Sequence, residues 1–295
     1  MVTIWCKEAN KVCSGWRFFF QGLADYLREH PEEAALLGNL SNYEPPKSVF
    51  GVSGLRIDAR YASVGYGADS AIGGEKRSAD IYGLNLDYHH DFGRWSLLAT
   101  LPVSWGSNNS VFSALDNTSL GITVVPRYHV LFPQVDGIAL DVDAVLGYRH
   151  IWFDDKSKLS GSFGLSDIDD PSSVQAGLLA TIGWAKGGFS VAGQVSHVDI
   201  RNLANEAAFG SQYSVTNFVL GARQTAGPIQ LGLDFSYNWL HNEDPAIDDS
   251  YGRVALSAEY PLSGGSSLRL AVDRTLDNAN YHATGVMLSY NMRFN

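Results

Sequence analysis

The sequence has few of the features that mark helical membrane proteins or nucleic-acid-binding proteins. No apolar run approaches the roughly 18 to 20 residues that a membrane-spanning helix needs, which excludes a bundle of such helices. The 21 Lys and Arg residues are scattered along the chain, and the formal net charge is -10. We therefore expect no nucleic acid partner. Membrane β-barrels are not excluded, because only every second residue of their strands must be apolar.

Cysteine is almost absent, and the start of the chain lacks a signal peptide. Cys6 and Cys13 are the two cysteines. They are compatible with a small disulfide loop in an oxidising compartment or with two free thiols. The opening "MVTIWCKEANKVCSGWRFFFQG" has no basic n-region, apolar h-region or small-residue cleavage site. Either the export signal is not part of this chain, or the protein is not exported.

Glycine and aromatic residues are abundant, and from about residue 48 the chain repeats one pattern. Apolar and polar residues alternate along each stretch until a break, as in strands with two different faces. The clearest stretch is "GIALDVDAVLGYRHIW". In order, the twelve predicted strands cover residues 57–61, 82–88, 95–105, 120–130, 138–152, 174–184, 189–195, 218–222, 229–239, 254–262, 268–272 and 286–294.

The breaks between these strands alternate between short and long. The short breaks are rich in turn residues: "HDFGR", "FPQVDG", "AKGG", "TAGP" and "LSGGS". The long ones cover about residues 62–79, 106–118, 153–173, 199–212, 240–250 and 274–280. Short turns on one side, long loops on the other and an even strand number are typical of membrane barrels. The predicted fold is all-β, a transmembrane antiparallel up-and-down β-barrel of about 12 strands, over residues 48–295.

Ionisable side chains lie on the face opposite the apolar stripes, where a soluble β-sandwich or soluble barrel would need a packed core. Many apolar stripes also end in aromatic residues, such as Trp95 and Trp105, as expected at lipid–water interfaces. A membrane barrel is therefore favoured over a soluble β protein. The predicted lumen-facing charges are Arg56, Asp58, Arg60, Asp141, Asp143, Arg149, Asp234, Arg253, Glu259, Arg269 and Arg293. Because both signs occur, we expect a salt-bridged interior or weak ion selectivity.

The last eight residues, "LSYNMRFN", place Leu288, Tyr290, Met292 and Phe294 on one face of a final strand. This end resembles the insertion signal of Gram-negative outer-membrane proteins, although there the aromatic residue is normally the last one, and here Asn295 follows it. The resemblance implies a location in the bacterial outer membrane. It also implies outer-membrane lipid, lipopolysaccharide and the barrel-assembly machinery as partners.

The layout of the chain resembles the translocator domain of autotransporters, in which a helix upstream of the first strand occupies the lumen. Residues 14–38 are the candidate for this helix, which Pro31 is expected to divide. Residues 1–47 are thus predicted to be an N-terminal helical segment that plugs or caps the barrel. The resemblance implies an autotransporter-type translocator or a small passive channel. The alternative is a structural or binding barrel within a larger assembly.

Outer-membrane lipid hydrolases also use twelve-stranded barrels, so histidines near serines were considered as catalytic candidates. Ser196 and His197 are adjacent in a strand and point to opposite faces. His89 and His90 precede Asp91 in a predicted tight turn. No glycine-flanked serine elbow and no His cluster with metal-ligand spacing occurs. We expect no enzymatic activity, no cofactor and no metal site, and calcium binding by the acidic loops is the less favoured reading.

Overall fold

The computed structural model describes residues 53–66, 77–109, 116–131, 137–153, 172–203, 212–242, 249–276 and 281–294. The predicted helical segment, both cysteines and Asn295 lie outside these residues. The strands are β1 (Ser53–Tyr66), β2 (Arg77–Asp91), β3 (Trp95–Asn109), β4 (Asp116–Leu131), β5 (Ile138–Phe153), β6 (Ser172–Lys186), β7 (Phe189–Asn202), β8 (Gln212–Ala226), β9 (Ile229–Asn242), β10 (Asp249–Pro261), β11 (Ser266–Leu276) and β12 (Tyr281–Phe294). One 3-10 turn, η3 (Ser263–Gly265), precedes β11. No helix in the described ranges is long and apolar enough to cross a membrane.

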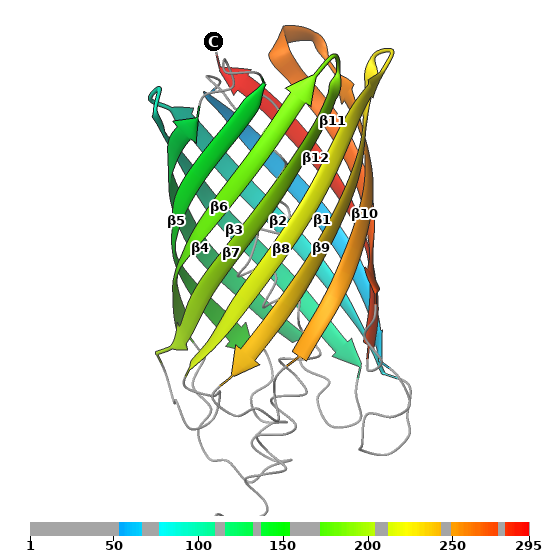
Figure 1. Cartoon of the computed structure of the whole chain (residues 1–295). Coiled ribbons are helices and arrows are strands. Elements are labelled where there is room, and N and C mark those ends of the chain that lie inside the picture. The colour runs from blue at the N-terminus through cyan, green and yellow to red at the C-terminus, as the bar shows by residue number, and fades with distance from the viewer. Residues whose placement is uncertain are drawn as a thin grey trace, which may run out of the picture.

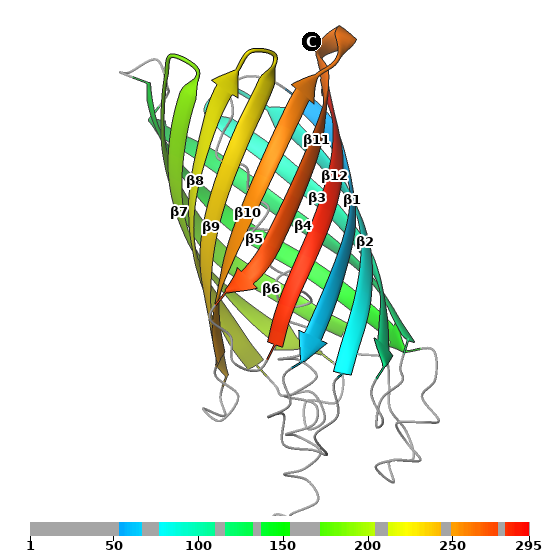
Figure 2. The same cartoon turned by 90° about the vertical axis from the view of Figure 1, so that its right-hand side faces the viewer.

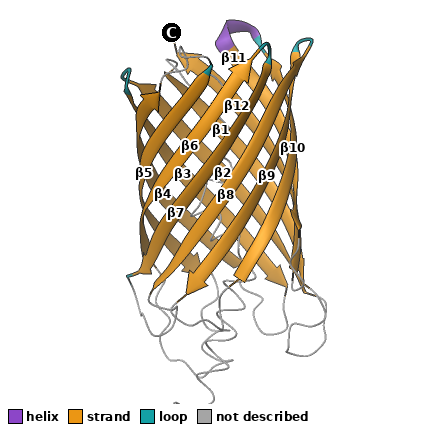
Figure 3. Ribbon diagram, viewed as in Figure 1, coloured by secondary structure: helices purple, strands orange, loops and turns teal. Residues whose placement is uncertain are grey.

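The strands form one closed antiparallel barrel in which each pairs with its neighbours in the chain (Figures 1 and 3). Closure is made by β1 and β12, which lie side by side in Figure 2 and pair over their whole length, from Ser53 opposite Phe294 to Tyr66 opposite Tyr281. The final strand therefore has a partner on both sides and presents no free edge. The predicted twelve-stranded up-and-down barrel is confirmed.

Tight turns join consecutive strands at the end of the barrel where the C-terminus lies (Figure 1). Between β6 and β7, Gly187 and Gly188 have φ of 61° and 80°. This left-handed conformation suits a two-residue hairpin turn and favours glycine. Contrary to the sequence prediction, His90 and Asp91 are the last residues of β2 and not part of the turn. Asp91 still stabilises the turn, because its Oδ1 accepts a hydrogen bond from the backbone N–H of Gly93 at 2.6 Å.

The strands extend further toward the opposite end than the sequence predicted. Residues 62–66, 106–109 and 199–202 were assigned to long breaks, yet they belong to β1, β3 and β7. The reason is that the inner face of the barrel changes from polar to apolar near this end. At this end the inward side chains are apolar, with Ala62, Ile81, Tyr251 and Ala283 in one buried cluster. The prediction followed outward-facing apolar residues, so it ended each strand where the apolar residues begin to face inward.

Candidate functional site: the charged interior

The two faces of the barrel wall have opposite polarity at mid-strand, and β11 shows this most clearly. Leu268, Leu270 and Val272 are 41, 51 and 45% exposed on the outer face. The residues between and beyond them point inward, and Arg269 and Asp273 are 5 and 7% exposed. A water-soluble barrel has the reverse arrangement, with apolar side chains inside and ionised ones outside. The candidate site is therefore the polar interior.

The predicted interior charges are not all buried to the same degree. Those below 9% exposure are Asp58, Asp141, Asp143, Arg149, Arg253, Glu259 and Arg269. Arg56, Arg60 and Asp234 are half-buried. Arg293 is exposed and lies next to the last residue of β12, opposite Gly54. Most of these groups are thus shielded from bulk water, and burying charges in this way is costly unless they are paired.

On β1 and β2, one guanidinium contacts two carboxylates. Arg56 donates from Nε to Oδ2 of Asp87 at 2.9 Å, and the same Nε lies 3.1 Å from Oδ2 of Asp58. Arg56 and Asp87 stand directly opposite each other in the ladder. The register of β1 against β2 therefore places this ion pair.

On β4 and β5, a second cluster joins two basic and two acidic side chains. Arg127 donates to both oxygens of Asp143, with Nε–Oδ1 and Nη2–Oδ2 distances of 2.8 and 2.7 Å. Asp141 Oδ1 shares a hydrogen bond with Nδ1 of His129 at 2.7 Å, and its Oδ2 lies 3.8 Å from Nη1 of Arg127. The side chains of Asp141, Asp143 and His129 are 1% exposed or less.

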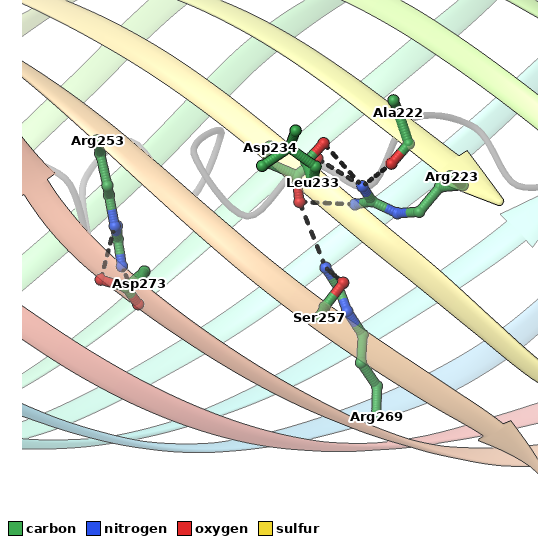
Figure 4. A network of polar contacts seen from close by, with 8 residues as sticks. All are labelled: Ala222, Arg223, Leu233, Asp234, Arg253, Ser257, Arg269 and Asp273. Atoms are coloured by element: carbon green, nitrogen blue, oxygen red, sulfur yellow. Dashed lines mark hydrogen bonds and ion pairs between the residues drawn. The ribbon is translucent and has the colours of Figure 1, made fainter.

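A third cluster spans β8 to β11 (Figure 4). Arg223 makes two contacts of 2.7 Å with the two oxygens of Asp234, and its Nη1 also donates to the carbonyl oxygen of Ala222 at 2.9 Å. Nη2 of Arg269 lies 3.6 Å from Asp234 Oδ2 and donates to Ser257 Oγ at 3.2 Å. Two guanidinium groups thus share one carboxylate.

Beside the third cluster, the carboxylate of Asp273 is also shared by two guanidinium groups. Arg253 donates from Nε to Asp273 Oδ2 at 2.9 Å, and its Nη2 lies 2.7 Å from Oδ1 (Figure 4). Arg60, on β1, brings its Nη2 to 3.7 Å from Oδ1 of Asp273. Because Asp273 and Arg60 come from strands on either side of β12, this contact links both sides of the closure.

Arg149 and Glu259 occupy different surroundings. Arg149 donates from Nη2 to Ser119 Oγ at 2.7 Å, and Ser119 and Ser104 share a hydrogen bond of 2.6 Å. Glu259 stands opposite Arg269 in the ladder between β10 and β11. Hydroxyl groups and carboxylates therefore both contribute to holding the inward arginines.

The predicted list of lumen-facing charges lacks five inward residues of these clusters: Asp87, Arg127, His129, Arg223 and Asp273. Arg223 and Asp273 lie one residue beyond the predicted ends of their strands, so they were left out of the list of inward charges. Arg127 and His129 alternate with the outward stripe of β4 and were detectable from that alternation. Asp87 alternates in the same way with the outward stripe of β2. Extending the strands predicted at residues 218–222 and 268–272 by one residue would have found Arg223 and Asp273.

Of the histidine candidates, His197 has a carboxylate neighbour, since its Nε2 lies 3.5 Å from Oδ1 of Asp199 on the outer face, but Ser196 points to the opposite face. Ser196 is 2% exposed, whereas the His197 side chain is 57% exposed and its Nδ1 contacts Thr216 Oγ1. His90 Nδ1 lies 2.8 Å from Ser53 Oγ, and its ring packs against Phe92. Within the described residues, no three His, Cys, Asp or Glu side chains are placed to hold a metal ion.

Comparison with known proteins gives similarity of structure only. No family profile and no curated protein sequence matches the chain. The translocator domain of the autotransporter NalP from Neisseria meningitidis superposes with a TM-score of 0.62 at 14% identity, covering 92% of this chain and 99% of that one. An outer-membrane channel from Pseudomonas putida F1 gives a TM-score of 0.57 at 16% identity, covering 85% of this chain and 100% of that one.

What the chain shares with these proteins is the barrel fold. The β domain of the Bordetella autotransporter BrkA is a further example, with a TM-score of 0.53 at 13% identity, covering 83% of this chain and 100% of that one. The predicted resemblance to autotransporter translocators and outer-membrane barrels is thereby confirmed in architecture. At identities this low, the fold does not assign the function.

Proposed function

We propose that this chain is a β-barrel of the bacterial outer membrane whose charged interior provides a path for polar solutes. The observation that carries the proposal is the polarity of the wall, with Leu268, Leu270 and Val272 exposed outside and Arg269 and Asp273 buried inside. An exposed apolar surface that continues around a closed barrel requires an apolar solvent, which a bilayer supplies. Charged groups inside are compatible with an aqueous path.

The dimensions and the aromatic residues of the wall support this location. Its strands contain from 11 to 16 residues, enough for tilted strands to cross the roughly 30 Å apolar core of a bilayer. Trp95 and Tyr128 pack at a centroid distance of 4.9 Å on neighbouring strands near the tight-turn end. Trp105 and Trp152 are 44 and 39% exposed toward the other end. These residues fit the two interfacial belts, so outer-membrane lipid and lipopolysaccharide are the proposed neighbours of the wall.

The outward side chains of β12 are proposed to form the assembly signal. Leu288, Met292 and Phe294 are 46, 37 and 42% exposed, and Tyr290 shares their face at intermediate exposure. The barrel-assembly machinery is the proposed partner that reads this stripe before β12 pairs with β1. The proposal contains no catalytic step and no cofactor.

Residues 1–47 are proposed to restrict the path through the barrel, and planar-bilayer recording tests this. We expect the full chain to conduct rarely and a variant lacking residues 1–47 to show stepwise openings, because the ladder from Ser53 to Phe294 closes without that segment. Circular dichroism and a heat-dependent mobility shift on electrophoresis serve as folding controls for both proteins. Silence of both folded proteins would contradict the pore.

A translocator of the autotransporter type is the second candidate. It is favoured by the superposition that covers 99% of the NalP translocator domain. The test is an immunoblot of native outer membranes and culture medium with an antibody against the barrel and a protein-terminal tag. A precursor much larger than 32.1 kDa, processed to a barrel fragment, would support a translocator. A single product of about the barrel's own size would exclude it.

A further inference from the structure

A contiguous set of uncharged polar side chains crosses four strands of the interior. We name Thr181 on β6, Gln194 and Ser196 on β7, Asn217 on β8 and Asn238 on β9 the uncharged strip. Thr181 stands opposite Gln194, Ser196 opposite Asn217, and Asn217 opposite Asn238. Gln194 and Ser196 are two residues apart and share one face of β7. Directly opposite positions are close enough for side chains to contact a common ligand.

The uncharged strip is buried but only partly satisfied. Its five residues are between 1 and 4% exposed. The amide of Asn217 donates to the side-chain oxygen of Asn238. The atoms without a hydrogen-bond partner are Thr181 Oγ1, both amide atoms of Gln194, Ser196 Oγ, Asn217 Oδ1 and Asn238 Nδ2. Unpartnered polar groups are costly in a buried site, so six such atoms side by side indicate a place where an external polar molecule binds.

The surroundings of the strip select against charged molecules. The inward side chains of β6 and β7 between residues 175 and 198 carry no ionisable group: Gln175, Leu179, Thr181, Ala192, Gln194, Ser196 and Val198. The nearest charges belong to the clusters on β4 with β5 and on β8 with β9. Asp141 of the first cluster stands directly opposite Thr181, but its carboxylate already contacts His129 and Arg127. A charged solute would lose hydration here without meeting a counter-charge on these two strands.

Aliphatic groups lie among the polar ones. Leu179 is 2% exposed and lies two residues before Thr181. Val219, 3% exposed, stands opposite Gln194. The strip therefore offers donors, acceptors and aliphatic contact on one surface. A sugar ring presents the matching combination, because each hydroxyl both donates and accepts and the ring carbons form an apolar face.

We propose that the uncharged strip binds neutral saccharides as they pass through the interior. The proposal rests on the proposed path for polar solutes and names the class of solute. Gln194 and Asn217 contribute the main contacts, because each has an unpartnered amide oxygen and both are central in the strip. Hydroxyl groups of the sugar supply the partners that these oxygens lack.

Isothermal titration of the full chain, folded in detergent, with maltohexaose and cellohexaose tests the proposal directly. We expect at least one sugar to bind. The double variant Gln194→Leu/Asn217→Leu should weaken that binding by about tenfold or more, since it removes the hydrogen-bonding groups at nearly constant size. The control is Asn291→Leu on β12, whose amide already donates to Ser267 Oγ at 3.1 Å, and it should leave sugar binding within about twofold. No binding of either sugar, or equal weakening by both variants, would overturn the proposal.

Hexagalacturonate, an anionic sugar of the same length, tests the preference for neutral solutes. We expect it to bind about tenfold more weakly than the neutral sugar, and equal or tighter binding would overturn the proposal. If neither neutral sugar binds and the double variant unfolds at higher denaturant concentration than the parent, the strip is merely hydrated, and the proposal is wrong. Bilayer recording of the variant that lacks residues 1–47 separates the two proposals: sugar binding without conductance by this variant contradicts the path but not the binding site, and conductance without sugar binding contradicts only the binding site.

Discussion

Arg223 and Asp234 form a bidentate ion pair between neighbouring strands, with both N–O distances at 2.7 Å. The same carboxylate lies 3.6 Å from Arg269, and the two arginine side chains are only 4 and 6% exposed. One acidic group therefore compensates two buried cations. This sharing makes the carboxylate more important to the barrel than either arginine.

Replacing Asp234 with Asn should destabilise the barrel strongly. The change leaves the charges of Arg223 and Arg269 without their shared carboxylate, and breaking a buried pair in this way typically costs about 3 to 5 kcal/mol. Adding Arg223→Gln to Asp234→Asn should recover much of the loss. The free energy of unfolding is measured by urea titration of tryptophan fluorescence in lipid vesicles.

Asp199→Asn is the matched control for this prediction, because the Asp199 side chain is 59% exposed on the outer face. It should change the free energy of unfolding by less than about 1 kcal/mol. Equal losses for Asp234→Asn and Asp199→Asn would show that the interior ion pairs do not hold the wall together.

Gly177 on β6 should not tolerate alanine. A Cβ at this position would lie 2.8 Å from Val198 Cα and would also meet the carbonyl oxygen of His197, so the backbone of β7 would have to move. We expect Gly177→Ala to cost about 1 to 3 kcal/mol. A Cβ added to Gly83 would meet no atom closer than 3.8 Å, and Gly83→Ala should be neutral or stabilise by up to about 1 kcal/mol. The denaturant midpoints of the two variants, measured in parallel, test this prediction. A larger loss of stability for Gly83→Ala than for Gly177→Ala would contradict the packing.

The apolar cluster at the end away from the tight turns should behave like a small protein core. Ile81 is 5% exposed and packs with Tyr251, so Ile81→Ala should cost about 2 to 5 kcal/mol. Thr284→Ala changes an exposed residue of the outer face and should stay within about 0.5 kcal/mol. Urea unfolding of both variants is the measurement. A negligible loss for Ile81→Ala would mean that this end is not packed.

Alternation along the chain was sufficient to predict the strand number, the antiparallel order and the direction of many side chains. Asp141 and Asp143 illustrate why. They lie within a long alternating stretch, so an error at either end of the predicted strand would not change which face they occupy. Arg223 and Asp273 were not predicted because the apolar stripes of their strands end at residues 222 and 272, whereas the strands continue to Ala226 and Leu276. The inward apolar cluster that contains Ile81 and Tyr251 was not predicted, because the inner face of a single strand changes from polar to apolar along its length.

The pairing of charges was also beyond the sequence. Alternation assigned Arg60 to the interior, but it did not reveal that Asp273 is its neighbour, since β1 and β11 are separated by β12 and by more than two hundred residues. The unpartnered atoms of Gln194 and Asn217 depend on the exact register of β7 and β8. Composition alone does not contain that register.

If the barrel conducts, its ion selectivity should be weak. Inward arginines and carboxylates are paired in every cluster, so the cation-to-anion permeability ratio should lie within about threefold of unity. Asp87→Asn with Asp143→Asn should shift the reversal potential in a salt gradient toward anion preference. The outward variant Asp199→Asn should not shift it. A strongly selective parent protein would contradict the balanced interior.

The central claim is that the outer face of the wall contacts lipid while the inner face does not. Spin labels at Leu270 and Ala271, adjacent on β11 and 51 and 5% exposed, test it by electron paramagnetic resonance in membranes, after Cys6 and Cys13 are replaced with serine. We predict that the label at residue 270 collides frequently with oxygen, which concentrates in lipid, and that the label at residue 271 does not. Equal oxygen accessibility at the two positions, or a higher value at residue 271, would contradict the account.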